Sequence, residues 1–129
     1  MSHPSAGDET GSAAVDFVLV GALTTVLFVA VLQLALALHI RSTLIDCAAE
    51  GARYGALADR TPQEGAARAE DLIELSLLPT FSQDVSAAIV DVAGLQVIEV
   101  HVTAPLPVIG LLGPAGRLDV TGHALREER

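Results

Sequence analysis

A long run without charged side chains dominates the hydrophobic pattern of the N-terminal third. It covers 22 residues, Phe17 to Leu38, and its polar members are Thr24, Thr25 and Gln33. As a helix rising about 1.5 Å per residue, the run reaches roughly 33 Å, enough for a hydrocarbon core of about 30 Å. The roughly 90 residues that follow are too few to enclose a helix that is apolar on all sides. The run therefore predicts a transmembrane helix, which we place at residues 12–40.

Beyond the apolar run, small side chains recur at spacings of three and four residues, as on one face of a helix. These residues are Ile40, Leu44, Ala48, Gly51, Gly55 and Ala58. Asp46, Glu50 and Arg53 occupy the opposite face. Because no proline or turn cluster intervenes, we expect one continuous helix from Ser12 to Ala58, with residues 41–60 as an extension outside the bilayer.

The sequence from Thr61 to Glu64 is a helix start. Thr61 can cap the first N–H groups, Pro62 suits the first turn, and Glu64 can complete a capping box. We expect this second helix to end near Leu78, before Pro79.

The last third alternates apolar and polar residues with the period of a strand. We predict strands at residues 85–92, 96–104 and 118–125, with a turn at Ala93-Gly94. The fold class is therefore α+β, with residues 61–129 forming a small domain in which the second helix packs on an antiparallel sheet. The uncharged segment Pro105 to Gly116 lies between the last two strands. It is either buried against the sheet or a contact for a partner or membrane.

Charge excludes one class of function. The chain carries 7 basic and 16 acidic residues, a net charge of −9, and 3% aromatic residues. Nucleic-acid binding needs basic groups for the phosphates and aromatic rings for the bases. We therefore expect no nucleic-acid partner.

A cleaved secretory signal is an alternative to the anchor, because Ala35-Leu36-Ala37 has the form of a signal-peptidase site. The apolar run exceeds the usual 7 to 15 residues, and Met1 to Thr10 contains no basic residue, which favours an anchor. Arg41, Arg53 and Arg60 follow the run closely. The positive-inside rule alone would keep that side in the cytoplasm.

Two motifs flank the apolar run, GSAAVDF at Gly11 to Phe17 and AAEGARYGA at Ala48 to Ala56. With the single anchor between them and a short β-rich C-terminal domain, the sequence resembles the TadE-like family. These are pilin-like minor components (pseudopilins) of Tad or Flp-type tight-adherence pilus systems. The resemblance spans most of the chain.

The resemblance implies that residues 1–11 are a leader, which prepilin peptidase removes after Gly11 to leave Ser12 as the N-terminus. Asp16 would then be the fifth mature residue, where pilin-like proteins usually carry Glu. With Phe17, it would contribute to helix pairing, its carboxylate meeting a free N-terminal amine in a medium of low dielectric constant. The shorter Asp and the acidic leader depart from the family pattern.

The resemblance also implies location and partners. It places the protein in the cytoplasmic membrane as a single-pass protein with an extracytoplasmic C-terminal domain, against the arginine count. The implied partners are prepilin peptidase, Tad assembly proteins and other pilin-like subunits, with homo- or hetero-oligomers forming through the N-terminal helix.

The second motif contains a glycine pair four residues apart, Gly51 and Gly55, around Arg53 and Tyr54. Such a pair lets another backbone approach closely. It either seats the helix against the C-terminal sheet or forms a seam between subunits.

Cys47 is the only cysteine, so it is either a small buried helix residue or a link between two copies. The histidines, His3, His39, His101 and His123, lack the spacing of metal ligands, and we expect neither metal nor cofactor.

The sequence has no nucleophile elbow, phosphate loop or paired catalytic carboxylates, so we expect no enzyme. Three functions remain: a processed pilin-like subunit, an uncleaved signal-anchored envelope adaptor, and a small binding domain secreted after cleavage at Ala37.

Overall fold

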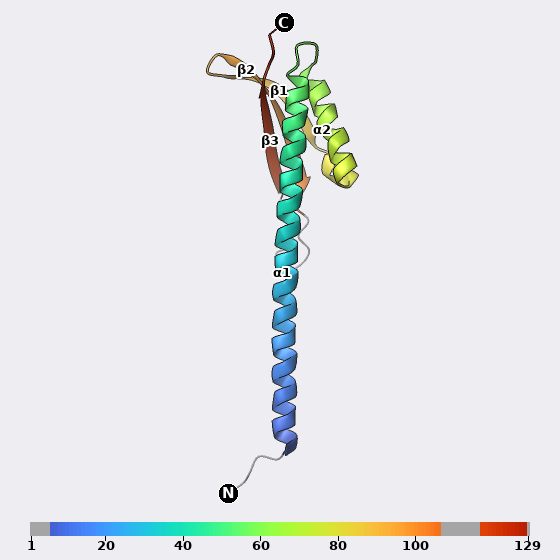
Figure 1. The fold of residues 1–129 in the computed structure, drawn as a ribbon, viewed down its shortest axis with the longest axis vertical. Coiled ribbons are helices and arrows are strands. Elements are labelled where there is room, and N and C mark those ends of the chain that lie inside the picture. Colours follow the sequence, from blue (N-terminus) through green and yellow to red (C-terminus); the bar gives the residue numbers. More distant parts are fainter. Residues whose placement is uncertain (1–5, 107–116, 129) are drawn as a thin grey trace. The chain divides into compact units, whose positions relative to one another are not determined.

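The computed structural model describes residues 6–106 and 117–128. The elements follow the order α1 (Ala6–Gly55), α2 (Pro62–Ser76), the short 3₁₀ helix η1 (Pro79–Ser82), β1 (Val85–Val92), β2 (Leu95–Pro105) and β3 (Arg117–Leu125) (Figure 1). This arrangement confirms the predicted α+β class. The chain divides into two compact units, Met1–Ala35 and Leu36–Arg129, and α1 contributes residues to both.

The first helix is longer at its N-terminus and shorter at its C-terminus than we predicted. It begins at Ala6 rather than Ser12, and Glu9 near that start is favoured by the partial positive charge of a helix N-terminus. It ends at Gly55 rather than Ala58, because the backbone hydrogen bonds there begin to join residues three apart instead of four. Ala56 N donates to the Arg53 carbonyl at 3.3 Å, and Leu57 N donates to the Tyr54 carbonyl at 3.3 Å.

The second helix begins as predicted, with Thr61 as N-cap, and ends at Ser76, two residues before the expected Leu78. Leu77 has extended backbone angles, φ −135° and ψ −174°. Because a proline restricts the residue before it to extended conformations, the helix cannot continue through Leu78 to Pro79. The sequence analysis did not predict η1, which starts at that proline.

The sheet has the order β1-β2-β3, and both pairs are antiparallel. Its strands match the predicted ranges to within one residue. Ala93 and Gly94 form the turn between β1 and β2 and have positive φ values of 55° and 84°. This two-residue turn with positive φ at both positions matches the right-handed twist of a hairpin.

The core of the Leu36–Arg129 unit lies between one face of the sheet and the two helices. Alternate β2 residues, Ile98, Val100 and Val102, are fully buried there. From α1, the core takes Ile40, Leu44, Cys47, Ala48 and Ala52, and Ala56 follows directly after the helix. The predicted small-residue face is therefore buried, except at Ala58, which is half-buried. The part of α1 that we expected to be a separate extension is one wall of this core.

Most of the uncharged segment between β2 and β3, residues 107–116, lies outside the described residues. Its burial and its contacts therefore stay predictions.

Candidate functional site

The residues that the sequence analysis assigned to processing and helix pairing lie together near the start of α1, in the Met1–Ala35 unit. Gly11, Ser12, Asp16 and Phe17 are all exposed, and Phe17 retains 80% of its accessible surface. A methyl group added at Gly11 would meet nothing within 4 Å. The side chain of Asp16 makes no hydrogen bond or ion pair with another described residue. Its carboxylate is therefore available for a partner from outside this part of the chain.

The apolar run contains no buried residue, and all of it is exposed except Gln33 and Ala37, which are half-buried. The helix is long and apolar enough to cross a membrane, and none of its most apolar 18-residue window is buried. The hydroxyls of Thr24 and Thr25 donate to the carbonyls of Val20 and Gly21, four residues earlier, at 2.7 and 2.8 Å. Because a hydrocarbon environment supplies no hydrogen-bond partners, this internal pairing suits a lipid-facing helix.

The glycine pair of the second motif contacts α2 rather than the sheet. A Cβ built at Gly51 would lie 2.6 Å from the Gly65 carbonyl oxygen and 2.7 Å from the Ala69 Cβ, and one at Gly55 would lie 3.1 Å from the Gly65 Cα. Within a chain, therefore, these glycines let the backbones of α1 and α2 touch. Whether they also form a seam between subunits stays a prediction.

A different glycine seats α1 on the sheet. A Cβ at Gly122 in β3 would overlap the backbone of Ala48 and Ala49. The sequence analysis did not single out Gly65 or Gly122. Both could have been predicted to contact another backbone, because a glycine inside a helix or strand weakens it and often marks a close backbone approach.

Arg53 and Tyr54, which lie between the two glycines in the sequence, are near the surface of the helix pair. Arg53 pairs with Glu50 across one helical turn at 3.3 Å, and both side chains are exposed. The guanidinium carbon of Arg60 lies 4.9 Å from the centre of the Tyr54 ring, and that of Arg68 lies 6.0 Å away. Tyr54 thus links the end of α1 to the start of α2 through cation–π contacts.

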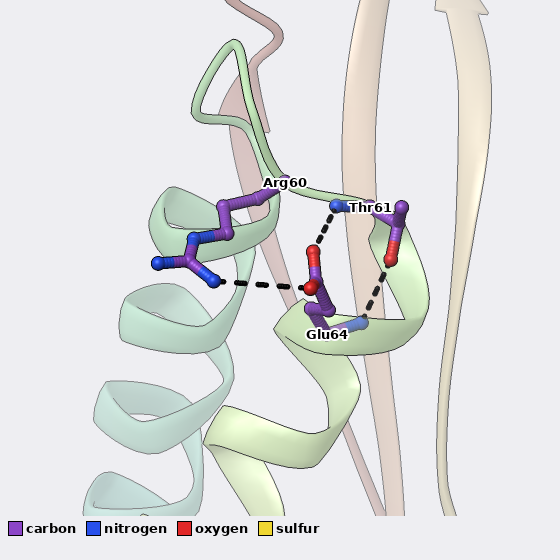
Figure 2. Close-up of polar contacts among 3 residues, drawn as sticks. All are labelled: Arg60, Thr61 and Glu64. Atoms are coloured by element: carbon purple, nitrogen blue, oxygen red, sulfur yellow. Dashed lines mark hydrogen bonds and ion pairs between the residues drawn. The ribbon is translucent and has the colours of Figure 1, made fainter.

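The start of α2 is fixed by the predicted capping box (Figure 2). The Thr61 backbone N–H donates to Glu64 Oε2 at 2.7 Å, and the Glu64 N–H donates to Thr61 Oγ1 at 3.2 Å. Arg60 Nη1 lies 3.8 Å from Glu64 Oε1. Because Gly65 follows Glu64 directly, the capping box sets where α2 meets Gly51 and Gly55.

Cys47 is a free cysteine, and 6% of its surface is exposed. Burial raises the pKa of its thiol, and the neighbouring Asp46 carboxylate raises it further, while a hydrogen bond with Ser76 acts in the opposite direction. The thiol is therefore held in its neutral, less reactive form. This environment is that of a small buried helix residue.

Two histidines lie on the outer face of the sheet, as predicted, and each pairs with a carboxylate on the neighbouring strand. His123 Nε2 lies 2.9 Å from Glu99 Oε2, and His101 Nε2 lies 3.5 Å from Asp119 Oδ1. Asp119 also accepts a hydrogen bond from the Thr103 hydroxyl at 2.7 Å. These pairs connect β2 to β3 across the face that the helices do not cover.

Residues 11–53 match the family model described as TadE-like protein. No curated protein and no solved structure matches the chain. The matched segment begins at Gly11, passes through Asp16 and the apolar run, and ends at Arg53, so it contains the first motif and most of the second. The helical segment at residues 11–53 is thus similar to the TadE-like family, the family that the two motifs predicted.

Proposed function

We propose that the chain is a membrane-anchored, pilin-like minor subunit for assembly of a Tad or Flp-type adhesion pilus or a related secretion apparatus. The observation that carries this proposal is the coincidence of the TadE-like match with a long helix whose most apolar 18-residue window is unburied. A globular protein would bury such a helix, because exposing it to water is costly. The anchor and the wall of the folded unit belong to the same helix.

Prepilin peptidase removes residues 1–11 in this proposal, and the new N-terminus lies at Ser12. The exposure of Gly11 and Ser12 supports access by a peptidase. The Leu36–Arg129 unit then lies outside the cytoplasm, and the anchor stays in the cytoplasmic membrane. The partners are prepilin peptidase, Tad assembly proteins and other pilin-like subunits.

Asp16 acts in assembly rather than in processing. An exposed carboxylate at the membrane entrance costs about 2.5 to 3.5 kcal/mol in hydrocarbon unless it is paired or shallow. Pairing with the amine of a free N-terminus, its own or that of a neighbouring subunit, offsets this cost and fixes the axial register of two helices.

The test is complementation of a deletion strain with full-length variants. We expect Asp16→Ala to keep cleavage after Gly11 but to reduce pilus number, while the matched variant Glu9→Ala, whose acid lies in the leader, restores wild-type numbers. Pili are counted by electron microscopy, and cleavage is followed by the mass of the mature chain. Normal pilus numbers with Asp16→Ala would exclude the charge contact, and normal numbers in the deletion strain would exclude the function.

One structural observation favours a second candidate, a secreted binding domain released after Ala37. The compact unit begins at Leu36, and its first buried residue is Ile40, so that cleavage would leave the core intact. This candidate predicts a soluble chain starting at Leu38 in the culture medium. The uncleaved adaptor predicts an intact leader in the membrane.

A further inference from the structure

The three-stranded sheet has two edges, β1 and β3, whose outward backbone groups have no partner among residues 6–106 and 117–128. The Thr103 N–H donates to the Asp84 carbonyl at 2.9 Å. Asp84 and Thr103 are therefore a hydrogen-bonded pair, and along β1 every second residue, the even-numbered ones, bonds to β2. The N–H and C=O groups of Val85, Ala87 and Ile89 therefore point away from β2. The Arg126 N–H donates to the Gln96 carbonyl at 3.0 Å, and the same alternation turns the odd-numbered residues of β3 outward.

The β1 edge lacks the features that keep open edges from pairing. It is eight residues long, pairs with β2 without a bulge, contains no proline, and carries one charged residue, Asp91. None of its residues is buried, and Ile89 keeps 42% of its surface exposed. Long, flat edges with little charge are templates for another strand.

The directions of the strands and of α1 limit which edge strands of two copies can pair. The two outer strands run parallel to one another, because each is antiparallel to β2. They also run in the direction of α1, since Ala48 contacts Gly122 and the Ala56 carbonyl accepts a hydrogen bond from the Glu127 N–H farther along both elements. A two-fold pairing of β1 with β1 would reverse α1 in one copy. Pairing β1 with β3 of a neighbour keeps the part of α1 that belongs to the Leu36–Arg129 unit in the same direction in both copies.

The residues of β1 and β3 that stand at the same level are chemically matched, except that Ala88 is level with His123. Both strands are in register with β2, which places Ser86 level with Thr121 and Val90 level with Leu125. Asp91 is level with Arg126, because both pair with Gln96. If β1 of one copy lies beside β3 of another with these residues level, Ser86 meets Thr121, Val90 meets Leu125 and Asp91 meets Arg126. Leu125, which is 62% exposed, would gain an apolar neighbour.

We propose that β1 of one copy pairs in parallel with β3 of a second copy of this chain, so that the sheet continues from copy to copy. Ala87 then donates its outward N–H to the Thr121 carbonyl of the neighbour, following the slanted bonds of a parallel ladder. Such a head-to-tail contact uses two different surfaces and leaves one free at each end, so further copies can add. It concerns the folded unit and does not depend on leader cleavage.

The test is disulfide cross-linking between two differently tagged full-length chains, expressed in the same membrane and each carrying Cys47→Ala. Ser86→Cys in one chain and Thr121→Cys in the other form the level pair. The matched control combines Ser86→Cys with Leu125→Cys, displaced by about 13 Å along the strand. Because a disulfide needs Cα atoms within about 7 Å, we expect roughly tenfold more linked product from the level pair than from the control.

A backbone variant tests the ladder itself. Ala87→Pro removes an N–H that faces away from β2, a position where edge strands tolerate proline. We expect it to leave the melting temperature within a few degrees but to abolish the link between Ser86→Cys and Thr121→Cys. Equal linkage of level and displaced pairs, or linkage unchanged by Ala87→Pro, would overturn the proposal. Linkage of Ser86→Cys chains with each other alone would replace it with a two-fold contact.

Discussion

The close approach of α1 and α2 predicts that one added methyl group at Gly51 destabilises the folded unit. In Gly51→Ala, the new Cβ would lie 2.6 Å from the Gly65 carbonyl oxygen and 2.7 Å from the Ala69 Cβ. Neither atom belongs to a flexible side chain, so the two helices must separate. Overpacking of this kind costs about 1–3 kcal/mol, and the better helix propensity of Ala returns up to about 1 kcal/mol. We expect a net loss of about 1–2 kcal/mol.

This loss is measurable as a melting temperature of the full chain in detergent micelles. At about 4–8 °C per kcal/mol for a unit of this size, Gly51→Ala should melt roughly 5–15 °C below wild type. The buried Cys47 is the only thiol, so its rate of alkylation during heating reports unfolding of the unit that contains it. Circular dichroism on the same samples monitors helix content.

Gly55→Ala is the matched control, because its Cβ would lie 3.1 Å from the Gly65 Cα and from the Thr61 carbonyl oxygen. A shift of a few tenths of an ångström removes that contact, so we expect a change within about 0.5 kcal/mol. The reasoning is refuted if Gly51→Ala melts at or above wild type, or if both variants lose the same stability. A Gly51→Ala chain that keeps its melting temperature but loses assembly would assign the glycines to a subunit seam.

Three further predictions are tested by thermal melting followed by circular dichroism, which needs no thiol. Ala93→Asn should stabilise the chain by about 0.5–1 kcal/mol, because Asn tolerates a positive φ better than Ala; an unchanged or lower melting temperature would argue against strain at this turn. Thr61→Ala should cost about 1 kcal/mol through loss of the helix cap, and no change would mean that the cap is dispensable. The raised pKa of Cys47 stabilises the fold fully below the ordinary value of 9.0, and this contribution is lost as the pH rises through the raised value. Stability should therefore fall more steeply above pH 9 in the wild type than in Cys47→Ala, and parallel pH profiles would contradict the effect of burial.

Local patterns in the sequence were sufficient for the strands and the start of α2. Alternation placed β1, β2 and β3 to within one residue, since one face of each strand must meet the core. The Thr61–Glu64 pair located the capping box because its hydrogen bonds involve neighbours in the sequence. The anchor was equally readable, because its apolar run has no charged interruption.

Contacts between distant segments could not be predicted. The sequence shows that Gly51 and Gly55 permit a close approach, but Gly65 becomes their partner only when the connection after α1 turns the chain back. The contact of Gly122 with α1 depends in the same way on how β3 lies under the helix. The sequence therefore predicted an extension outside the bilayer with one face of mostly small residues, but not that α2 and β3 are the segments that cover this face.

The role of Asp16 and Gly11 rests on partners outside the chain. Both residues are exposed, and their local structure is plain helix. Their proposed chemistry comes from the family resemblance and from the cost of a carboxylate at the membrane entrance. The proposed amine is created only by cleavage after Gly11, and the peptidase is another protein, so neither can be read from local sequence patterns.

The central claim is that this chain is a processed, membrane-anchored pilin-like subunit, and its mature N-terminus tests that claim most directly. Mass spectrometry of membrane and culture fractions, from strains with and without prepilin peptidase, identifies the first residue. The account predicts a start at Ser12 in the membrane fraction, lost when the peptidase is absent. An intact leader in both strains, or a chain in the medium that starts at Leu38, would contradict it.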